Sequence, residues 1–383
     1  MTSADAFCRS NIDWLLDLVE ELSTHESPTD DKAAVDRCGR RLAERLNELG
    51  AVVTCKAESI VGNHLIATFG TGLRQILLLG HMDTVWPVGQ LEHMPIKREH
   101  GRLHGPGVFD MKAGIGIAAL ATRAVLARRR LDGARLVMLW TADEETGSET
   151  SRTLIEAEAR KSDAVLVFEP ALTDGGLKTS RKGCGQYELV AHGIAAHAGL
   201  DPRKGVSAIR EIARQILALE TLQDLDRGIS VNVGLVMGGS RPNVVAEEAR
   251  VTIDVRVPTK KDADRFNRAI HALAPQLSGA RITVTGGFER PPMERTKGVA
   301  QLFAVARSVA DELDMTLTEG STGGGSDGNF TTAIGIPTLD GLGAIGDGAH
   351  ALHEHVKIEA LAPKAALVAG IIERLLVENP VVL

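Results

Sequence analysis

The chain contains few aromatic residues and few cysteines. Among its 383 residues there are 8 Phe, 3 Trp and 1 Tyr, so the core must consist mainly of smaller aliphatic side chains. The four cysteines are scattered and include no CxxC pair, which argues against a disulfide framework and against a thiolate zinc site. They are Cys8, Cys38, Cys55 and Cys184.

Long apolar runs and blocks of like charge are also missing. No stretch approaches the roughly 18 consecutive apolar residues that a membrane span needs. The 43 basic and 50 acidic residues give a net charge of −7, and no basic stripe suggests nucleic-acid binding. The first residues include acids where a signal peptide would have a basic segment and an apolar core. We therefore expect a soluble, cytoplasmic protein that binds neither membrane nor nucleic acid.

The length of the chain exceeds that of one ordinary domain. Up to residue 181, strand-like and helix-like segments alternate, which predicts a mostly parallel sheet flanked by helices. Residues 182–292 follow the order strand, helix, strand, strand, helix, strand, which predicts a four-stranded α+β domain with two helices. The α/β pattern then resumes. We predict an α/β domain of residues 1–181 and 293–383 that is interrupted by an inserted domain of residues 182–292.

The first candidate site residue is His81, directly after the apolar run at residues 76–79. In an extended segment, residues i and i+2 point the same way, so Asp83 can lie behind His81. A carboxylate in that place fixes the imidazole tautomer and makes the other ring nitrogen a better metal ligand. Taken alone, the segment is more simply interpreted as an ordinary polar strand end.

Acidic candidates follow at Asp110 and at Glu144 and Glu145. Asp110 could simply cap the helix that follows it, and Thr141 with Glu144 has the spacing of a capping box. However, the three successive carboxylates 143–145 repel one another unless a cation or strong hydrogen bonding relieves them. Glu144 and Glu145 could divide the work, with one binding a metal and the other transferring protons.

Two further candidates complete a set of nitrogen and oxygen ligands. Glu169 ends the apolar run 164–168, and His350 precedes the last predicted helix. Such a set without sulfur suits catalytic zinc, with cobalt or manganese as substitutes. A carboxylate that bridges two metals would explain why so many acids follow strand ends.

These segments resemble, in chain order, the motifs of the dinuclear zinc amidohydrolases, a family that includes glutamate carboxypeptidase, aminoacylase and succinyl-diaminopimelate desuccinylase. The glutamate carboxypeptidase branch is the most similar. The motifs are GHMDTV (80–85), GPGVFDMKAG (105–114), ADEETGS (142–148), FEP (168–170), HAG (197–199), GGGSD (323–327), ERPPM (289–293) and GAHxxxE (348–354).

The resemblance implies two zinc ions per chain. One is bound by His81, Asp110 and Glu169, and the other by Asp110, Glu145 and His350, so that Asp110 bridges them. It also implies that Asp83 supports His81 and that Glu144 is the general acid/base for a zinc-activated water. Histidines at 353 and 355 compete for the role of His350, which is preferred because Glu354 and Val356 follow at the family's usual spacing.

Within the inserted domain, His197 taken alone is most simply a structural histidine at a turn. The resemblance instead makes it a lid-domain histidine that reaches the active site of the partner subunit in a homodimer. It also assigns Asn243 to the oxyanion region and Arg256 to the α-carboxylate of the substrate. The alternative for Arg256 is a surface charge on a strand.

Two more substrate contacts are predicted near the domain junctions. Arg290 could bind an acidic side chain of the substrate, although a solvated hinge arginine is an equal alternative. The glycine loop at residues 323–328 lacks the order of a phosphate loop. It is better interpreted as a loop whose backbone N–H groups, at Gly325 and Ser326, approach a substrate carboxylate.

Two classes of function are compatible with these motifs. The first is a metal-dependent hydrolase that releases a C-terminal amino acid, with glutamate as the candidate, from an N-acyl or peptide substrate. N-acyl-amino-acid deacylase and dipeptidase are alternatives on the same metal core. The second is a catalytically silent protein that binds a metal or ligand. Every expected catalytic position is filled, so we predict a hydrolase.

Overall fold

The computed structural model describes residues 3–377, which form two compact units. Unit 1 comprises the chain up to Thr179, Arg295–Ser321 and the residues from Ser326 onward. Unit 2 comprises Ser180–Glu294 and Thr322–Gly325. No helix in this described part of the chain is long and apolar enough to cross a bilayer.

Unit 1 is built on a six-stranded sheet with the order β1-β2-β6-β3-β7-β14. β6, β3, β7 and β14 are parallel to one another, whereas β2 is antiparallel to both of its neighbours. The predicted, mostly parallel sheet flanked by helices is confirmed. The strands are β1 (Val52–Lys56), β2 (His64–Gly70), β3 (Arg74–His81), β6 (Ala134–Thr141), β7 (Ala164–Val167) and β14 (Thr338–Leu339).

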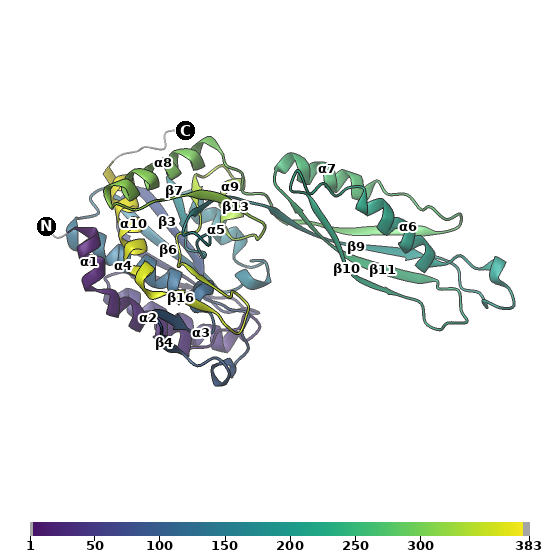
Figure 1. Cartoon of the computed structure of the whole chain (residues 1–383), viewed down its shortest axis with the longest axis horizontal. Helices are drawn as coiled ribbons and strands as arrows, with labels where there is room; N and C mark the ends of the chain where they lie inside the picture. Colours follow the sequence, from purple (N-terminus) through teal and green to yellow (C-terminus); the bar gives the residue numbers. More distant parts are fainter. Residues whose placement is uncertain (1–2, 378–383) are drawn as a thin grey trace. The chain divides into compact units, whose positions relative to one another are not determined.

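Both faces of this sheet are buried because alternate residues of each central strand pack on opposite sides. In β3, Ile76 and Leu78 join a core with α4 and α10, whereas Leu77 and Leu79 join one with α5 and α9. Figure 1 shows α4 and α10 to the left of β3 and β6, and α5 and α9 to their right. The helices are α1 (Ala4–Ser10), α2 (Ile12–Thr24), α3 (Lys32–Glu48), α4 (Ala113–Arg128), α5 (Arg152–Ala159), α8 (Lys297–Glu312), α9 (Gly328–Ala333) and α10 (Ile358–Val377).

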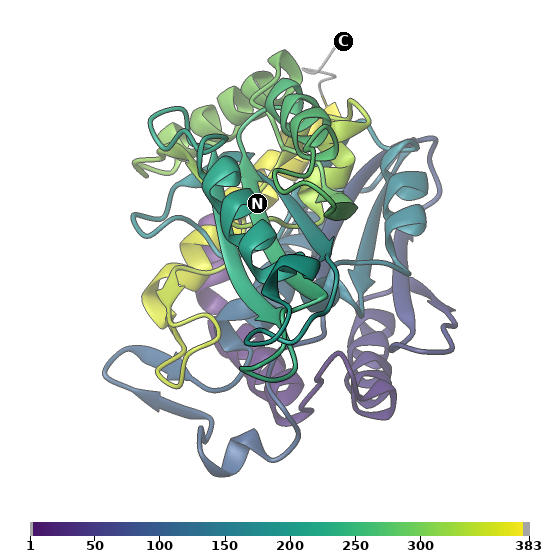
Figure 2. The ribbon, with the colours of Figure 1, turned by 90° about the vertical axis from the view of Figure 1, so that its right-hand side faces the viewer.

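Several short strands of the structure were not predicted, and four of them, β4, β5, β15 and β16, contain only two or three residues, too few to show an alternating pattern. One small sheet has the order β15-β16-β5-β4 and joins the segment before α10 to the segment before Asp110. Figure 2 shows its β4–β5 segment, in blue, at the lower left. The bounds are β4 (Lys97–Glu99), β5 (Arg102–His104), β15 (Gly346–Asp347) and β16 (His355–Lys357), with β8 (Leu177–Arg181) and β13 (Glu319–Thr322) forming a separate two-stranded sheet.

Unit 2 contains an antiparallel sheet with the order β10-β11-β9-β12 and two helices, as predicted for the inserted domain. The helices cover one face, which alternating residues of β9 and β11 fill (Figure 1). β12 extends to Arg290 because its pairing with β9 continues that far. The elements are β9 (Gly183–His192), α6 (Ala208–Glu220), β10 (Ser230–Gly238), β11 (Glu248–Val257), α7 (Lys260–His271) and β12 (Arg281–Arg290).

Candidate metal centre and active site

The candidate residues of unit 1 lie where the central parallel strands end. His81 is the last residue of β3, Glu144 and Glu145 follow β6, and Glu169 follows β7. Since β6, β3 and β7 are adjacent and parallel, their carboxyl ends share one edge of the sheet. This is the edge at which open α/β sheets bind ligands.

Asp110 connects two groups of potential ligands. His81, Asp110 and Glu169 form the first group, and Asp110, Glu145 and His350 form the second. One oxygen of Asp110 lies 3.4 Å from His81 Nε2, and the other lies 3.5 Å from His350 Nε2. Glu169 Oε1 lies 3.5 Å from His81 Nε2, and Glu145 Oε2 lies 3.3 Å from His350 Nε2. The structure therefore brings together all five residues predicted as metal ligands.

These separations fit a tetrahedral metal. Two ligands at about 2.0–2.1 Å from a tetrahedral zinc ion lie about 3.3–3.4 Å apart. In addition, Asp110 Oδ1 and Glu145 Oε1 are buried and accept no hydrogen bond from the described residues. Buried carboxylate oxygens normally have a partner, and a cation in each group would supply it. Asp110 makes no side-chain cap to α4, so the capping alternative is not supported.

The charges of the two groups hold their histidines in the protonated form when no metal is bound. The carboxylates of Asp110 and Glu145 raise the pKa of His350 to about 10. Burial acts to raise the pKa of Asp110, but the imidazoles of His350 and His81 outweigh it and hold that pKa well below its usual value. Burial raises the pKa of Glu145. A divalent cation would replace these protons.

His350 is distinguished from its two neighbouring histidines by its surroundings. Only its imidazole, among the three, belongs to a described ligand group. His355 is buried and packs against the His104 ring, with centroids 5.3 Å apart. His353 Nε2 lies 3.9 Å from Asp347.

Asp83 supports the site differently from the prediction. The closest partner of His81 Nδ1 is the backbone oxygen of Asp83, at 3.0 Å, and the carboxylate is at 3.5 Å. The carboxylate accepts hydrogen bonds from Thr29 Oγ1 and from the amides of Glu144 and Glu145. Burial acts to raise the pKa of Asp83, but its interactions with His81 and these donors hold the pKa below its usual value. Asp83 thus orients His81 and also fixes the turn that carries Glu144.

Two residues that sequence reasoning missed hold the same acidic turn. Asp143 is buried and accepts hydrogen bonds from Thr150 and Ser151. These donors stabilise the negative charge of one of the three successive carboxylates. Asp327, also buried, accepts from the hydroxyls of Thr141 and Ser148. The hydroxyl of Thr141 is therefore bound to Asp327, and the alternative of a capping box with Glu144 is not supported. The position of Asp327 in GGGSD was the available signal.

His197 and Asn243 lie on adjacent, exposed loops of unit 2. The amide of Ala198 donates to the backbone oxygen of Asn243, and His197 forms a bridge with Val244. His197 Nδ1 accepts from the amides of Gly199 and Leu200, each at 3.1 Å. Because Nδ1 accepts from these two amides, Nε2 is the ring nitrogen that is left to donate.

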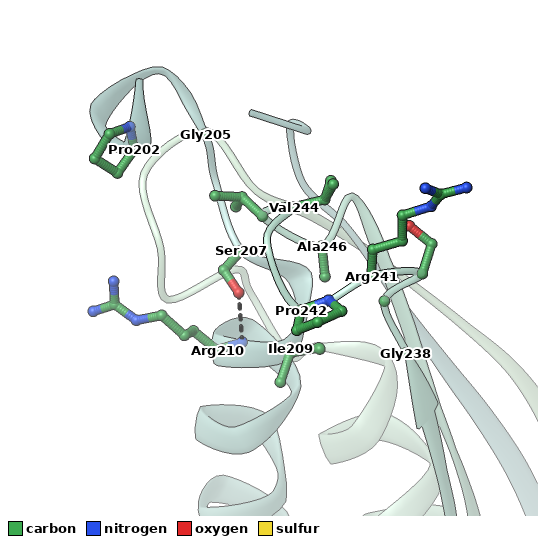
Figure 3. A pocket seen from close by; sticks show the side chains of 13 residues that line it. Pro202, Gly205, Ser207, Ile209, Arg210, Gly238, Arg241, Pro242, Val244 and Ala246 are labelled. Carbon is green, nitrogen blue, oxygen red and sulfur yellow. Dashed lines mark hydrogen bonds between the residues drawn. The ribbon is translucent and has the colours of Figure 1, made fainter. Parts of the chain in front are cut away.

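A cavity of about 660 Å³ lies beside these loops within unit 2. Figure 3 shows Arg241, Pro242 and Val244 on one side and Ser207 at the start of α6, where its hydroxyl accepts from the amide of Arg210. Neither His197 nor Asn243 lines the cavity. It is therefore separate from both predicted contacts.

Arg256, Cys184 and Arg290 form a row across three adjacent strands, β11, β9 and β12. Arg256 makes a bidentate pair with Asp254, through Nε at 2.9 Å and Nη2 at 2.8 Å, so it is no isolated surface charge. The Arg290 side chain is buried, with 6% of the residue exposed. This burial contradicts the alternative of a solvated hinge arginine.

The glycine loop differs from its predicted role at one residue. Ser326 is fully buried, its amide donates to Asn329 Oδ1 and its hydroxyl donates to Asp340. Because both groups have protein partners, the prediction of Ser326 as a substrate contact is wrong for this structure. A Cβ on Gly325 would lie 2.7 Å from Arg290 Cδ and 3.0 Å from Cys184 Sγ, so glycine allows the loop to pack on that row.

Comparisons with known proteins identify the family. The model of peptidase family M20/M25/M40 matches residues 77–374. Carboxypeptidase G2 of Pseudomonas sp. (strain RS-16) is 30% identical over 364 residues, covering 92% of this chain and 87% of the relative. Succinyl-diaminopimelate desuccinylase of Xanthomonas oryzae pv. oryzae (strain PXO99A) is 30% identical over 385 residues, covering 95% of this chain and 99% of the relative.

The crystal structure of aminopeptidase PepT from Bacillus cereus shares the fold, with a TM-score of 0.82 at 24% identity, and the match covers 95% of this chain and 98% of that one. The chain therefore belongs to peptidase family M20/M25/M40 and is an enzyme that hydrolyses amide bonds.

Proposed function

We propose that this enzyme binds two zinc ions and releases a C-terminal amino acid, preferably glutamate, from N-acyl or peptide substrates. The observation that carries the proposal is the position of Asp110, whose two oxygens belong to two complete ligand groups. The relative named carboxypeptidase G2 supports this reaction type. The desuccinylase has the same sequence identity, 30%, so deacylation of an N-acyl amino acid is the second candidate. Hydrolysis of a dipeptide on the same metal core is a further alternative.

The roles of the residues follow from their chemistry. Zinc, or cobalt or manganese in its place, would polarise the scissile carbonyl and lower the pKa of a bound water. Glu144 takes a proton from the attacking water and delivers it to the leaving nitrogen. Asp83 holds the amide of Glu144 and so limits the positions that the carboxylate reaches. The Nε2–H group of His197 and the amide of Asn243 are the proposed donors to the oxyanion.

We expect metal-depleted protein to take up two ions per chain and to release protons as it does so. His350 has a pKa of about 10 in the metal-free protein, so it is still protonated at pH 8 and must lose that proton to bind a metal. Metal affinity should therefore fall as the pH is lowered. Calorimetric titration at pH 8 in two buffers of different ionisation enthalpy measures the number of protons released. Uptake of fewer than two ions, or heats that do not depend on the buffer, would contradict this expectation.

We propose that Arg256 binds the α-carboxylate of the leaving amino acid and that Arg290 selects an acidic side chain. A guanidinium matches a carboxylate with two parallel hydrogen bonds, and Arg256 already shows this geometry with Asp254. A substrate carboxylate would share the Arg256 guanidinium with Asp254 or displace Asp254 from it. Gly325 is proposed to let a substrate approach the same row through its backbone.

Arg256→Lys should lower kcat/KM for every substrate with a free C-terminal carboxylate by about 10–100-fold, because a point charge replaces a bidentate partner. Arg290→Ala should lower kcat/KM for acyl-glutamate by a similar factor and leave acyl-leucine nearly unchanged. The two substrates, measured on each variant and on wild type, provide the comparison. A uniform loss in Arg290→Ala would assign that residue a structural role. A wild-type preference for bulky apolar leaving groups would favour the aminoacylase alternative.

We propose that the enzyme is a homodimer formed through the inserted domain, residues 182–292. β10 is an edge strand of the unit 2 sheet, so one side of its backbone has no neighbouring strand among the described residues. Leu235, Val236 and Met237 of this strand are exposed. A second copy that pairs with this edge would cover both the backbone groups and the apolar side chains.

If His197 acts on the partner's site, two inactive variants should complement each other. In an equal mixture of His197→Ala and Glu144→Gln, half of the dimers are mixed, and each mixed dimer has one complete site. Activity should therefore return to about a quarter of the wild-type value in a two-fold symmetric dimer. His197→Ala mixed with the double variant His197→Ala/Glu144→Gln is the control without recovery. An inactive first mixture, after subunit exchange is verified, would exclude action in trans.

The cysteines support the cytoplasmic location that we propose. All four are free, and two of them, Cys8 and Cys38, are buried as reduced thiols. Reduced thiols are typical of proteins in a reducing compartment.

A further inference from the structure

Glu354 lies in the tight turn that carries His350, yet the reaction scheme gives it no part. It is 1% exposed. The turn is closed by hydrogen bonds from the amide of Ala351 to Gly348 O and from the amide of Glu354 to Ala351 O. A side chain that anchors Glu354 therefore also limits the movement of His350.

The carboxylate of Glu354 accepts four hydrogen bonds from two other segments. Oε1 accepts from the amides of Phe109, at 2.9 Å, and Asp110, at 3.1 Å. Oε2 accepts from the amide of Gly107, at 3.0 Å, and from Trp86 Nε1, at 2.7 Å. Three segments that carry ligands or their supports thus meet at one buried side chain: the segment after His81, the segment of Asp110 and the turn of His350.

We propose that Glu354 is a positioning residue, which holds the backbone of Asp110 against the turn of His350 and so sets the metal affinity of the site. This inference rests on the proposed function, because it requires that Asp110 and His350 bind metal. Hydrogen-bonded partners of ligands typically change metal affinity by about 10–100-fold when they are replaced. Glu354 acts on the backbone of a ligand and on the turn of a second ligand.

Glu354→Gln tests the proposal with little change in volume. An amide side chain has one acceptor oxygen and one NH₂ group. Whichever way it is turned, two of the four N–H donors face another donor, so the 107–110 segment loses one or two of its three amide contacts with this side chain. We expect an affinity for Zn²⁺ about 10–100-fold lower than in wild type, measured by competition with a chelator on metal-depleted protein. The absorption spectrum of the Co²⁺ form should change as well, because it reports ligand geometry.

Glu211→Gln is the matched control. Glu211 is also fully buried, and it accepts from the amides of Gln276 and Leu277 and from Gln215 Nε2, but it belongs to unit 2. The Glu211→Gln variant should bind Zn²⁺ with the affinity of wild type, even if its melting temperature falls as much as that of Glu354→Gln. Equal losses of affinity in the two variants would show a general effect of instability and overturn the proposal.

Two further outcomes are separable. Wild type that binds no metal refutes the proposed function, whereas wild-type affinity in Glu354→Gln refutes only the role of Glu354. If Glu354→Gln does not fold, Trp86→Phe removes one donor from Oε2, and the same titration should show a several-fold loss. Unchanged affinity in Trp86→Phe would then count as refutation.

Discussion

Glu144→Gln should leave both metals bound and lower kcat by about 10²–10⁴-fold or more, since glutamine can neither take a proton from water nor return it to the leaving nitrogen. The backbone of Glu144 remains attached to Asp83 in this variant, because that contact uses the amide rather than the side chain. The turn should therefore keep its place. Steady-state kinetics together with elemental analysis of the same preparation measure both parts of the expectation.

Glu145→Gln is the natural comparison, since it changes the adjacent residue in the same way. Glu145 belongs to the second ligand group, with its Oε2 at 3.3 Å from His350 Nε2. This variant should lose metal affinity, and excess metal should restore part of its activity. Near-normal turnover in Glu144→Gln, or rescue of that variant by excess metal, would move the proton-transfer role to another residue.

Asp110→Asn should have the largest effect on metal binding, because Asp110 belongs to both ligand groups. The amide of asparagine has a single oxygen, so one of the two groups loses its oxygen ligand whichever way the amide is turned. We expect the affinity for Zn²⁺ to fall by more than the roughly 10–100-fold that is typical when a hydrogen-bonded partner of a metal ligand is replaced. The pKa of His350, about 10 in the metal-free protein, should fall toward its ordinary value, since Asp110 is the largest cause of the increase. A histidine titration followed by NMR in metal-free protein measures this change without any activity assay.

Glu169→Gln provides the control for Asp110→Asn. Glu169 belongs to the first group only, so this variant should retain one ion and an essentially unchanged His350 pKa. If Asp110→Asn bound two ions with wild-type affinity, the assignment of Asp110 as the shared ligand would fail.

The positions of three of the five candidate ligands could be anticipated because these residues lie at or just after strand ends. Apolar runs before His81, Glu145 and Glu169 mark buried parallel strands, and the ends of such strands meet at one edge. The fold class follows from the same alternation of segments. His350 was identified by its motif alone, since the two-residue and three-residue strands around it have no pattern of their own.

The supporting contacts could not be anticipated, because they join residues that are distant in the chain. Nothing near Asp327 in sequence indicates that Thr141 and Ser148 donate to it. The backbone oxygen of Asp83, rather than its carboxylate, is the closer partner of His81, and that choice depends on how the chain turns after β3. Arg290 is placed by the pairing of β12 with β9, which continues through Gly286 and Gly287 to Arg290.

The pairing of Arg181 with Met293 has a consequence for synthesis on the ribosome. The chain enters and leaves unit 2 through these two neighbouring segments, and unit 2 is contiguous apart from Thr322–Gly325, so most of it can collapse as soon as it emerges. Unit 1 is formed by three separate stretches of the chain, so it cannot complete its fold as it emerges. β7 obtains its outer partner β14, and Asp110 obtains His350, only after the whole of unit 2 has been translated. Until then the nascent chain carries an exposed strand edge and an incomplete metal site, which makes premature metal capture and intermolecular strand pairing the hazards of this topology.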